Sequence, residues 1–405
     1  MSMISINRRV FHLSGYDPMT PAAYHKRFVR ELRRFETCWG VKASSRDFAE
    51  TETSASWTVT VTGADWSVTS QHDLLRWDDV IARHRSNGVL QRWWDGILAF
   101  ADFTRHGALV AYLRVAWRYA VFFLYPFAVM TALVLAGWLG SRIVNAAGLP
   151  LPVALVGGAS LTLFCIIRLV SRTHVGHLLD DWSFATRIAR DVNPVIAPRI
   201  KTMADKMLST PETTPCLVVG HSLGAVLAID MLDEALKHSP GARRLGFLTL
   251  GSSILKIALH RKAHGLRARV ANVATSQQVD WAEYQALNDV MNFYRSEPVT
   301  ALGLGGKAPV VRLVRFRSML APAYYKSIKR NFFRLHCQFI SGNDLRSRYD
   351  YLMTICGPFE LMALVRSPDG AQSWIGEDGS LAGGASGALL PTAPVSLSAK
   401  DKDQP

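Results

Sequence analysis

The sequence predicts an α/β fold in which a mostly parallel sheet is flanked by helices and interrupted by a membrane hairpin. Short apolar runs typical of buried strands alternate with segments of helical periodicity on both sides of the chain's centre. Two long uncharged stretches lie in that centre. We expect residues 1–105 and 172–366 to form two parts of one domain, with residues 106–171 inserted between them. Residues 367–405 are rich in Gly, Ala, Ser and Pro, which predicts a disordered tail.

The composition restricts the class of protein. The 405-residue chain has 46 Lys and Arg against 32 Asp and Glu, a formal net charge of +14. Such an excess suits nucleic acid, an anionic membrane surface or the cytoplasmic flanks of membrane spans. No zinc-finger spacing and no basic repeat with interleaved aromatic residues occurs, so we expect no nucleic-acid partner. The five cysteines are odd in number and widely spaced, which predicts reduced thiols. The stretch MSMISINRRVFHLSG lacks a long apolar run, so we expect no secretory signal in it.

The first part of the predicted domain contains a strand, a helix and a β-hairpin. The apolar run in RRVFHLSGYDP predicts a buried strand followed by a loop. TPAAYHKRFVRELRRF has helical spacing, with Thr20 as N-cap and Pro21 at the first helical position. SWTVTVTGADWSVTS alternates between apolar and polar residues and breaks at residues 63–65, which predicts a hairpin.

Two uncharged stretches, 119–141 and 143–167, predict a transmembrane hairpin. A membrane-spanning helix needs about 20 apolar residues, so we expect spans at about 119–140 and 149–168. The basic residues lie at the outer flanks: Arg105, Arg114, Arg118, Arg168, Arg172 and Arg187. Only Arg142 lies at the tip, so the positive-inside rule places both termini in the cytoplasm. The alternative is a pair of buried helices in a soluble protein.

An amphipathic segment precedes this hairpin. In VLQRWWDGILAFADFTRHG, Trp93, Ile97 and Phe100 recur at helical spacing. The helix lies either on the membrane surface or against the soluble domain.

The second part of the domain continues the alternation. DDWSFATRIARDV predicts a helix, PCLVV a strand, SLGAVLAIDMLDEALKHS a helix and LGFLTLGSS a strand. RVANVATSQQVDW and PVVRLVRF predict two further strands.

The stretch CLVVGHSLGAVLAIDML contains the strongest functional signal. Its centre, Gly220-His221-Ser222-Leu223-Gly224, is a G-x-S-x-G motif between a predicted strand and a predicted helix. A sharp strand-to-helix turn exposes a serine nucleophile above the sheet. The positive end of the following helix would face an oxyanion formed there. The alternative is a glycine-rich turn in a nonenzymatic domain.

A serine nucleophile needs a base, and the base needs an orienting acid. In one chain order of such triads the acid follows the serine and the histidine comes last. His336, in FFRLHCQFI, follows the last predicted strand and fits this order, unless it is simply packed in an apolar helix. His238 ends the helix after Ser222, and His260 and His264 come early for a base.

The acid is less sharply indicated. Asp289, in ALNDVMNFY, lies in a predicted loop beyond a strand and is our expected acid. Asp280 and Glu283, in QQVDWAEY, remain alternatives. Asp344 and Asp350 come after His336 and are expected to be structural.

Two backbone N–H groups would complete an oxyanion hole. One is that of Leu223, directly after the nucleophile. The other is that of Gly15 or Tyr16 in FHLSGYDP, unless this segment is an ordinary turn at the end of a strand.

The chain resembles the α/β-hydrolase superfamily, especially its lipase-like serine esterases, in VVGHSLGAVLA and LTLGSS. It is also similar to a group of uncharacterised bacterial membrane hydrolases in FHLSGYDP, RWDD, the arginine-flanked hairpin, the G-x-S-x-G turn, and a late H-x-Q followed by RYDY. The resemblance covers about residues 8 to 360 and implies hydrolysis of an ester-like bond. Two features depart from the superfamily. The usual two strands before the oxyanion strand are missing, and the insertion precedes the nucleophile.

The sequence therefore predicts a membrane-anchored serine hydrolase that cleaves an acyl ester without metal or cofactor. Its partners would be membrane lipids and its substrate a small acyl ester or a lipid. We expect the catalytic domain on the cytoplasmic side of the inner membrane. The alternative is a catalytically inactive hydrolase-fold membrane protein that binds a lipid or a protein.

Overall fold

The computed structural model describes residues 3–238 and 243–392, with the side chains of 167–173 excepted. The chain divides into two compact units. The sheet unit comprises Met1–Asp79, Pro194–Ile254 and Ala268–Pro405, and the hairpin unit comprises Val80–Asn193 and Leu255–Arg267. The hairpin unit is therefore broader than the predicted insertion at 106–171.

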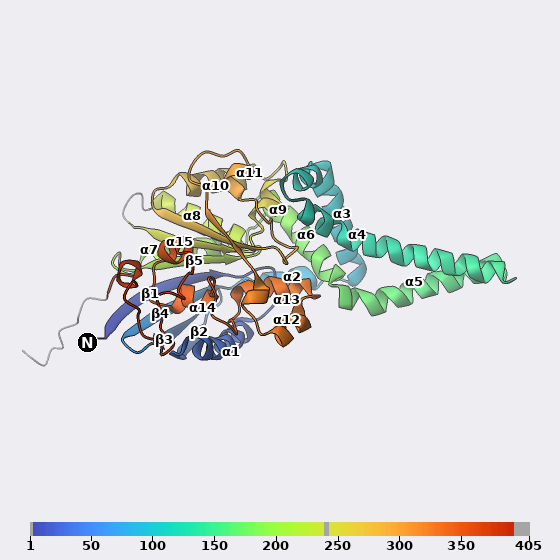
Figure 1. Ribbon diagram of the computed structural model, residues 1–405. Helices are drawn as coiled ribbons and strands as arrows, with labels where there is room; N and C mark the ends of the chain where they lie inside the picture. Colours follow the sequence, from blue (N-terminus) through green and yellow to red (C-terminus); the bar gives the residue numbers. More distant parts are fainter. Residues whose placement is uncertain (1–2, 239–242, 393–405) are drawn as a thin grey trace, which may run out of the picture. The chain divides into compact units, whose positions relative to one another are not determined.

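One eight-stranded sheet organises the sheet unit, in the order β2-β3-β4-β1-β5-β6-β7-β8 (Figure 1). The six strands from β4 to β8 along this order are parallel, whereas β2 and β3 are antiparallel to their neighbours. The strands are β1 (Ile4–Leu13), β2 (Lys42–Glu50), β3 (Ser54–Thr62), β4 (Trp66–Leu75), β5 (Cys216–His221), β6 (Leu245–Leu250), β7 (Val279–Ala286) and β8 (Val310–Val314). The prediction of an α/β fold with a mostly parallel sheet is confirmed.

The first strand lies inside the sheet, between β4 and β5. Its register pairs Ile4 with Trp66 on one side and Leu13 with Gly220 on the other. Strands β4, β3 and β2 follow β1 in the chain but fill the sheet positions beyond it. No strand precedes β1 among the described residues, yet the edge of β1 that faces away from β5 is paired with β4.

Helices cover both faces of this sheet. Helices α7 and α8 pack on one face, and α1 and α14 pack on the other (Figure 1). The Thr20 hydroxyl accepts a hydrogen bond from the N–H of Ala23 at the start of α1, so the predicted cap is confirmed. The helices assigned to this unit or crossing its boundaries are α1 (Pro21–Trp39), α2 (Asp78–Arg85), α7 (Ile196–Leu208), α8 (Gly224–His238), α9 (Ile254–Ala258), α10 (His264–Thr275), α11 (Pro298–Ala301), α12 (Pro322–Ile328), α13 (Phe332–Cys337), α14 (Tyr351–Cys356) and α15 (Leu361–Arg366).

One predicted strand is wrong. RVANVATSQQVDW does not begin as a strand, because its first part belongs to helix α10, and β7 starts only at Val279. The buried residues Leu266, Val270 and Val273 are spaced at i, i+4 and i+7, so they line one face of a helix. Valine is β-branched and favours strands on average, so the segment was predicted as a strand despite its helical spacing.

The prediction of disorder from residue 367 onward is wrong for residues 367–392. Arg346 binds this segment by donating hydrogen bonds to the carbonyls of Ile375 and Gly376. The indole N–H of Trp66 donates to the carbonyl of Gly379 over 2.9 Å. Because glycine-rich chain offers few side chains to bury, backbone groups supply most of these contacts. Residues 393–405 lie outside the described residues.

The hairpin unit is helical. Its remaining helices are α3 (Val89–Arg105), α4 (Ala108–Ala146), α5 (Leu151–Thr173) and α6 (Val175–Ala189). The predicted amphipathic segment forms α3, which packs on α6 where a Cβ on Gly96 would lie 2.6 Å from Cβ of Leu179. Helix α4 is kinked at Ala116, whose φ of −154° is not helical.

Helices α4 and α5 run side by side as a hairpin (Figure 1). They touch backbone to backbone, because a Cβ on Gly158 would lie 2.4 Å from the carbonyl oxygen of Gly137. Helix α4 is long and apolar enough to cross a membrane, whereas the apolar stretch of α5 within the described residues, Leu151–Ile166, is shorter. The second predicted span therefore stays a prediction, and its end at 167–168 lies outside the described side chains.

Large apolar side chains cover the outside of this hairpin. Trp117 and Trp138 are 65% and 58% exposed. So many exposed large apolar side chains on two neighbouring helices are uncommon on soluble proteins. Further exposed members are Val121, Val134, Leu135, Leu139, Ile143, Leu151, Val153, Leu155, Val156, Leu163 and Phe164.

Candidate active site

Ser222 lies at the sharp turn between β5 and α8. Its φ is +55°, in the left-handed region that side-chain-bearing residues rarely adopt. Two backbone hydrogen bonds hold the turn, from the Ser222 N–H to the Leu250 carbonyl over 3.0 Å and from the Ser253 N–H to the Ser222 carbonyl over 3.1 Å. The end of β6 and the loop that follows it thus brace the turn that presents the serine hydroxyl.

The loop after β1 passes directly over this turn. A Cβ on Gly224 would lie 1.9 Å from the carbonyl oxygen of Leu13, and one on Gly15 would lie 2.9 Å from Cβ of Ser222. Only glycine fits at either position without moving backbone or the serine. Gly220 is similarly confined, because a Cβ there would lie 2.5 Å from Cα of Ala225. The close approach places the predicted oxyanion loop against Ser222.

His336 and Asp289 form a buried pair. Nδ1 of His336 lies 2.8 Å from Oδ2 of Asp289, and both residues are 2% exposed. Because a carboxylate only accepts, the imidazole donates through Nδ1–H. Nε2 of His336 is buried and has no hydrogen-bond partner among the described residues. A neutral imidazole in this tautomer carries its free lone pair on Nε2, as a general base requires.

The serine turn also holds the backbone of His336. His221, the residue before Ser222, donates through Nε2 to the His336 carbonyl over 3.2 Å, and the two rings lie 4.6 Å apart. Burial, followed by the proximity of His336, holds the pKa of His221 well below its usual value, so this ring is neutral. A Cβ on Gly251, which follows β6, would lie 2.8 Å from Cε1 of His336. No hydrogen bond joins His336 to Ser222, and such contacts commonly tighten only when substrate binds.

Asp289 is fixed by its own loop. Its Oδ1 accepts a hydrogen bond from the N–H of Met291 over 2.9 Å. The side-chain amide of Asn292 donates to the carbonyl of Ala286 over 2.9 Å and also to the carbonyl of Asp289. Asn292 was not singled out from the sequence. The sequence signal for its role is its position three residues after the acid, because an asparagine side chain can form hydrogen bonds with the backbone of its own loop.

The other predicted acids have different partners. Asp280, at the start of β7, forms an ion pair with Arg244. Glu283 lies within β7 and accepts hydrogen bonds from Gln285 over 2.7 Å and Thr249 over 3.2 Å. The structure therefore brings His336 together with Asp289 and with neither alternative.

The remaining candidate acids have other partners, and His238 and His264 form hydrogen bonds within their own helices, α8 and α10. Asp344 pairs with Arg34, and Asp350 caps helix α14. His238 is exposed at the end of α8.

The expected oxyanion donors flank the serine. The N–H groups of Leu223 and Gly15 act as donors in none of the turn and loop hydrogen bonds formed by the described residues. Helix α8 begins at Gly224, so its positive end faces the turn at Ser222. The ring of Tyr16 packs edge-on against Trp77, whose indole N–H donates to the Ser14 hydroxyl over 3.2 Å. These contacts hold the loop in place.

A separate cluster in the hairpin unit contains potential metal ligands. The ligand atoms of Asp102, His106 and His260 lie within 4.8 Å of one another. Nδ1 of His260 accepts from the N–H of Lys262 over 3.2 Å, so Nε2 carries the proton and donates to Asp102 over 3.0 Å. Asp102 also pairs with Arg190. Because Nε2 is already a donor and a guanidinium neutralises the carboxylate, the cluster fits a hydrogen-bond network better than a cation.

Comparison of the chain with protein-family models, curated proteins and solved structures finds no match. The resemblance to α/β hydrolases therefore depends on the motifs and stays a prediction.

Replacing Ser222 with glycine should stabilise the fold relative to Ser222→Ala by about 1 kcal/mol. Both variants lose the hydroxyl, but only alanine keeps a Cβ at positive φ. Urea unfolding of the two purified variants in one detergent measures the difference. A Ser222→Gly protein less stable than Ser222→Ala would contradict the strained turn.

Glu283 should make stability fall between about pH 4.5 and pH 7. Burial raises the pKa of this carboxyl from 4.5 to about 7, while hydrogen bonds from Gln285 and Thr249 oppose the rise. In this range the folded protein retains a proton that the unfolded chain has lost. The free energy of unfolding therefore decreases as pH rises, by at most about 1.4 kcal/mol per unit.

Urea unfolding of the wild type and Glu283→Gln at pH 5, 6, 7 and 8 tests this. The difference between the two proteins isolates Glu283, because every other titratable group is present in both. Identical pH slopes in the two proteins would show that Glu283 does not titrate as described.

Proposed function

We propose that this chain is a membrane-anchored serine hydrolase that cleaves acyl esters. One observation carries the proposal: a buried Asp289–His336 pair, with a free imidazole Nε2, is braced by the same turn that holds Ser222 at positive φ. A strained serine, a histidine and an orienting carboxylate in this chain order are what nucleophilic acyl transfer needs. The motif resemblance to α/β hydrolases supports the same reaction.

In the proposed mechanism Ser222 attacks the ester carbonyl carbon. His336 takes the serine proton on Nε2 and later gives it to the leaving alcohol. Asp289 holds Nδ1–H and stabilises the imidazolium. The N–H groups of Leu223 and of Gly15 or Tyr16 stabilise the oxyanion, aided by the positive end of α8. Water activated by His336 then hydrolyses the acyl-enzyme and restores the serine.

We further propose that the α4–α5 hairpin crosses the cytoplasmic membrane twice. The exposed apolar side chains of both helices support this, because contact with water is unfavourable for them whereas the hydrocarbon core of a membrane would cover them. The distribution of arginines favours a cytoplasmic catalytic domain. Membrane lipids and other membrane-proximal esters are then the nearest substrates.

A fluorophosphonate probe should label the wild type at Ser222 and leave Ser222→Ala unlabelled. Asp289→Asn should lower the rate of p-nitrophenyl butyrate hydrolysis about 10⁴-fold, because the orienting carboxylate is lost. His336→Ala should lower it at least as much. Gel fluorescence and absorbance measure these effects in purified protein.

Asp280→Asn is the matched control, since it removes a carboxylate in β7 that pairs with Arg244 and not with His336. It should keep full labelling. Full activity of Asp289→Asn would show that the acid assignment is wrong. A folded wild type that resists the probe would instead favour an inactive scaffold that binds a lipid or protein.

Alkaline phosphatase fusions in a Gram-negative host test the two spans. The enzyme is active only outside the cytoplasm, so a fusion after Asn145 should be active and one after His174 inactive. Activity at both points would mean that α5 does not return across the membrane. Inactivity after Asn145 would contradict the membrane hairpin altogether.

A further inference from the structure

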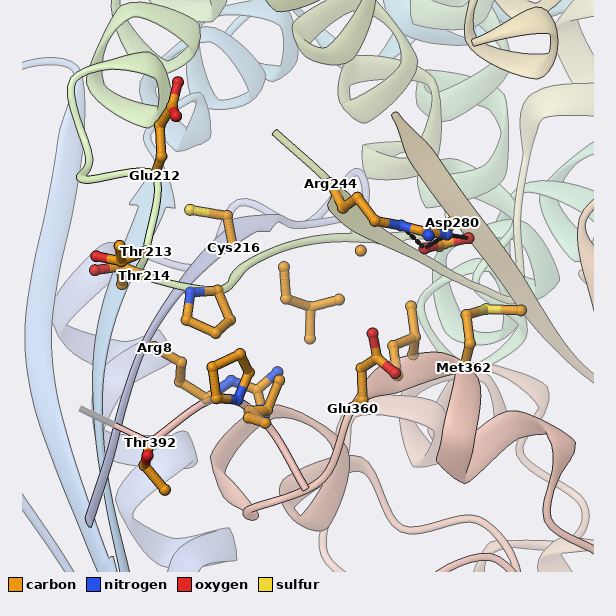
Figure 2. A pocket seen from close by; sticks show the side chains of 16 residues that line it. Arg8, Glu212, Thr213, Thr214, Cys216, Arg244, Asp280, Glu360, Met362 and Thr392 are labelled. Atoms are coloured by element: carbon orange, nitrogen blue, oxygen red, sulfur yellow. Dashed lines mark hydrogen bonds and ion pairs between the residues drawn. The ribbon is translucent and has the colours of Figure 1, made fainter. Parts of the chain in front are cut away.

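A cavity lies in the sheet unit, at the opposite ends of the strands from Ser222. It has a volume of about 720 Å³ and is lined at the amino ends of β5, β6 and β7 by Cys216, Gly246 and Asp280 (Figure 2). Ser222 follows the carboxyl end of β5. The cavity is therefore separate from the proposed catalytic site, and its volume suits a small molecule.

The walls are largely apolar. Pro215, Leu217, Leu361 and Leu390 line it, and they come from three distant parts of the chain. Gly246 leaves this wall uncrowded, whereas a side chain there would press on Leu217, because a Cβ would lie 3.0 Å from its Cδ1. A ligand in this cavity would bury an apolar body.

Arg8 places one uncompensated positive charge in the cavity wall. It is only 4% exposed, and Nη1 donates to the carbonyls of Thr354 and Gly357 over 3.0 and 3.1 Å. Nε has no partner, and the guanidinium forms no ion pair with any carboxylate of the described residues. Figure 2 shows its side chain extending from the strand towards the middle of the cavity.

Such a cation is costly to bury alone. Burial lowers the pKa of Arg8 to about 10, so it still carries its charge at neutral pH. A buried charge is ordinarily paired. The absence of an acidic partner among the described residues leaves an anionic ligand group as the natural counter-ion.

The other charges around the cavity do not supply that counter-ion. Asp280 is already paired with Arg244 at 2.7 Å and with Lys307 at 3.4 Å. Glu212 and Glu360 also line the cavity but are exposed, so water and salt screen them. Arg8 is thus the dominant buried charge.

We propose that this cavity binds a fatty acid, with the carboxylate on Arg8 and the alkyl chain against Pro215, Leu217, Leu361 and Leu390. A single guanidinium matches a singly charged carboxylate, which it can bind through two N–H donors. The apolar walls supply the rest of the affinity. The site does not use Ser222 and stands independently of the proposed hydrolase activity.

Equilibrium dialysis of radiolabelled octanoate against the full chain in lipid nanodiscs tests the site, with empty nanodiscs subtracted. Octanoate should bind saturably, and unlabelled octanoate should displace it whereas octanol should not. Arg8→Met should weaken binding at least tenfold, because the head-group partner is lost, and Arg8→Lys should weaken it less. Lys307→Met, which removes a nearby positive charge outside the cavity, should change affinity less than twofold.

Gly246→Val provides a test that leaves Arg8 intact. Its side chain should obstruct the cavity and abolish octanoate binding while thermal melting shows a folded protein. Failure of the wild type to bind octanoate saturably would overturn the proposal. So would equal displacement by octanol, or affinities of folded Arg8→Met and Gly246→Val within twofold of the wild type.

Discussion

The left-handed turn at Ser222 is the constraint on which the rest of the candidate site depends. Because its φ is +55°, the turn needs support from both neighbouring strands. The end of β1 packs against it through the Leu13 carbonyl, and the loop after β6 bonds to it through the N–H of Ser253. His221, next to Ser222, donates a hydrogen bond to the His336 carbonyl and so links the turn to His336. Three strand ends and one helix therefore meet at a single strained residue.

Local patterns predicted most of this arrangement. Short segments of the sequence indicate the strand, the turn and the helix around Ser222, and they indicate the order of Ser222, Asp289 and His336. Long-range partners decided the remainder. Residues 367–392 are ordered by Arg346 and Trp66, which no local composition reveals. The Arg8 cavity likewise combines three distant segments. Helix α10 was mistaken for a strand because valine favours strands on average, whereas its spacing here is helical.

Three residues of the motifs that suggested a family, His12, Tyr351 and Asp79, have structural roles that do not involve the serine. His12 of FHLSGYDP accepts or donates at both nitrogens, to Tyr351 of RYDY at 3.2 Å and to His72 at 2.8 Å. Burial lowers the pKa of His12 to about 3, so this chain of polar groups is uncharged. Asp79 of RWDD forms an ion pair with Arg199. These residues join β1 to β4 and α14, and α2 to α7.

The position of β1 has a consequence for how the protein is made. One edge of β1 can pair with β4 early, but the other edge must wait for β5, whose first residue is Cys216. During synthesis the whole helical hairpin emerges while that apolar edge is open, which exposes a nascent chain to misassociation. The carbonyl of Gly379 reaches Trp66 later still. Folding of the sheet unit is therefore expected to be slow and to depend on protection of an unfinished sheet by chaperones.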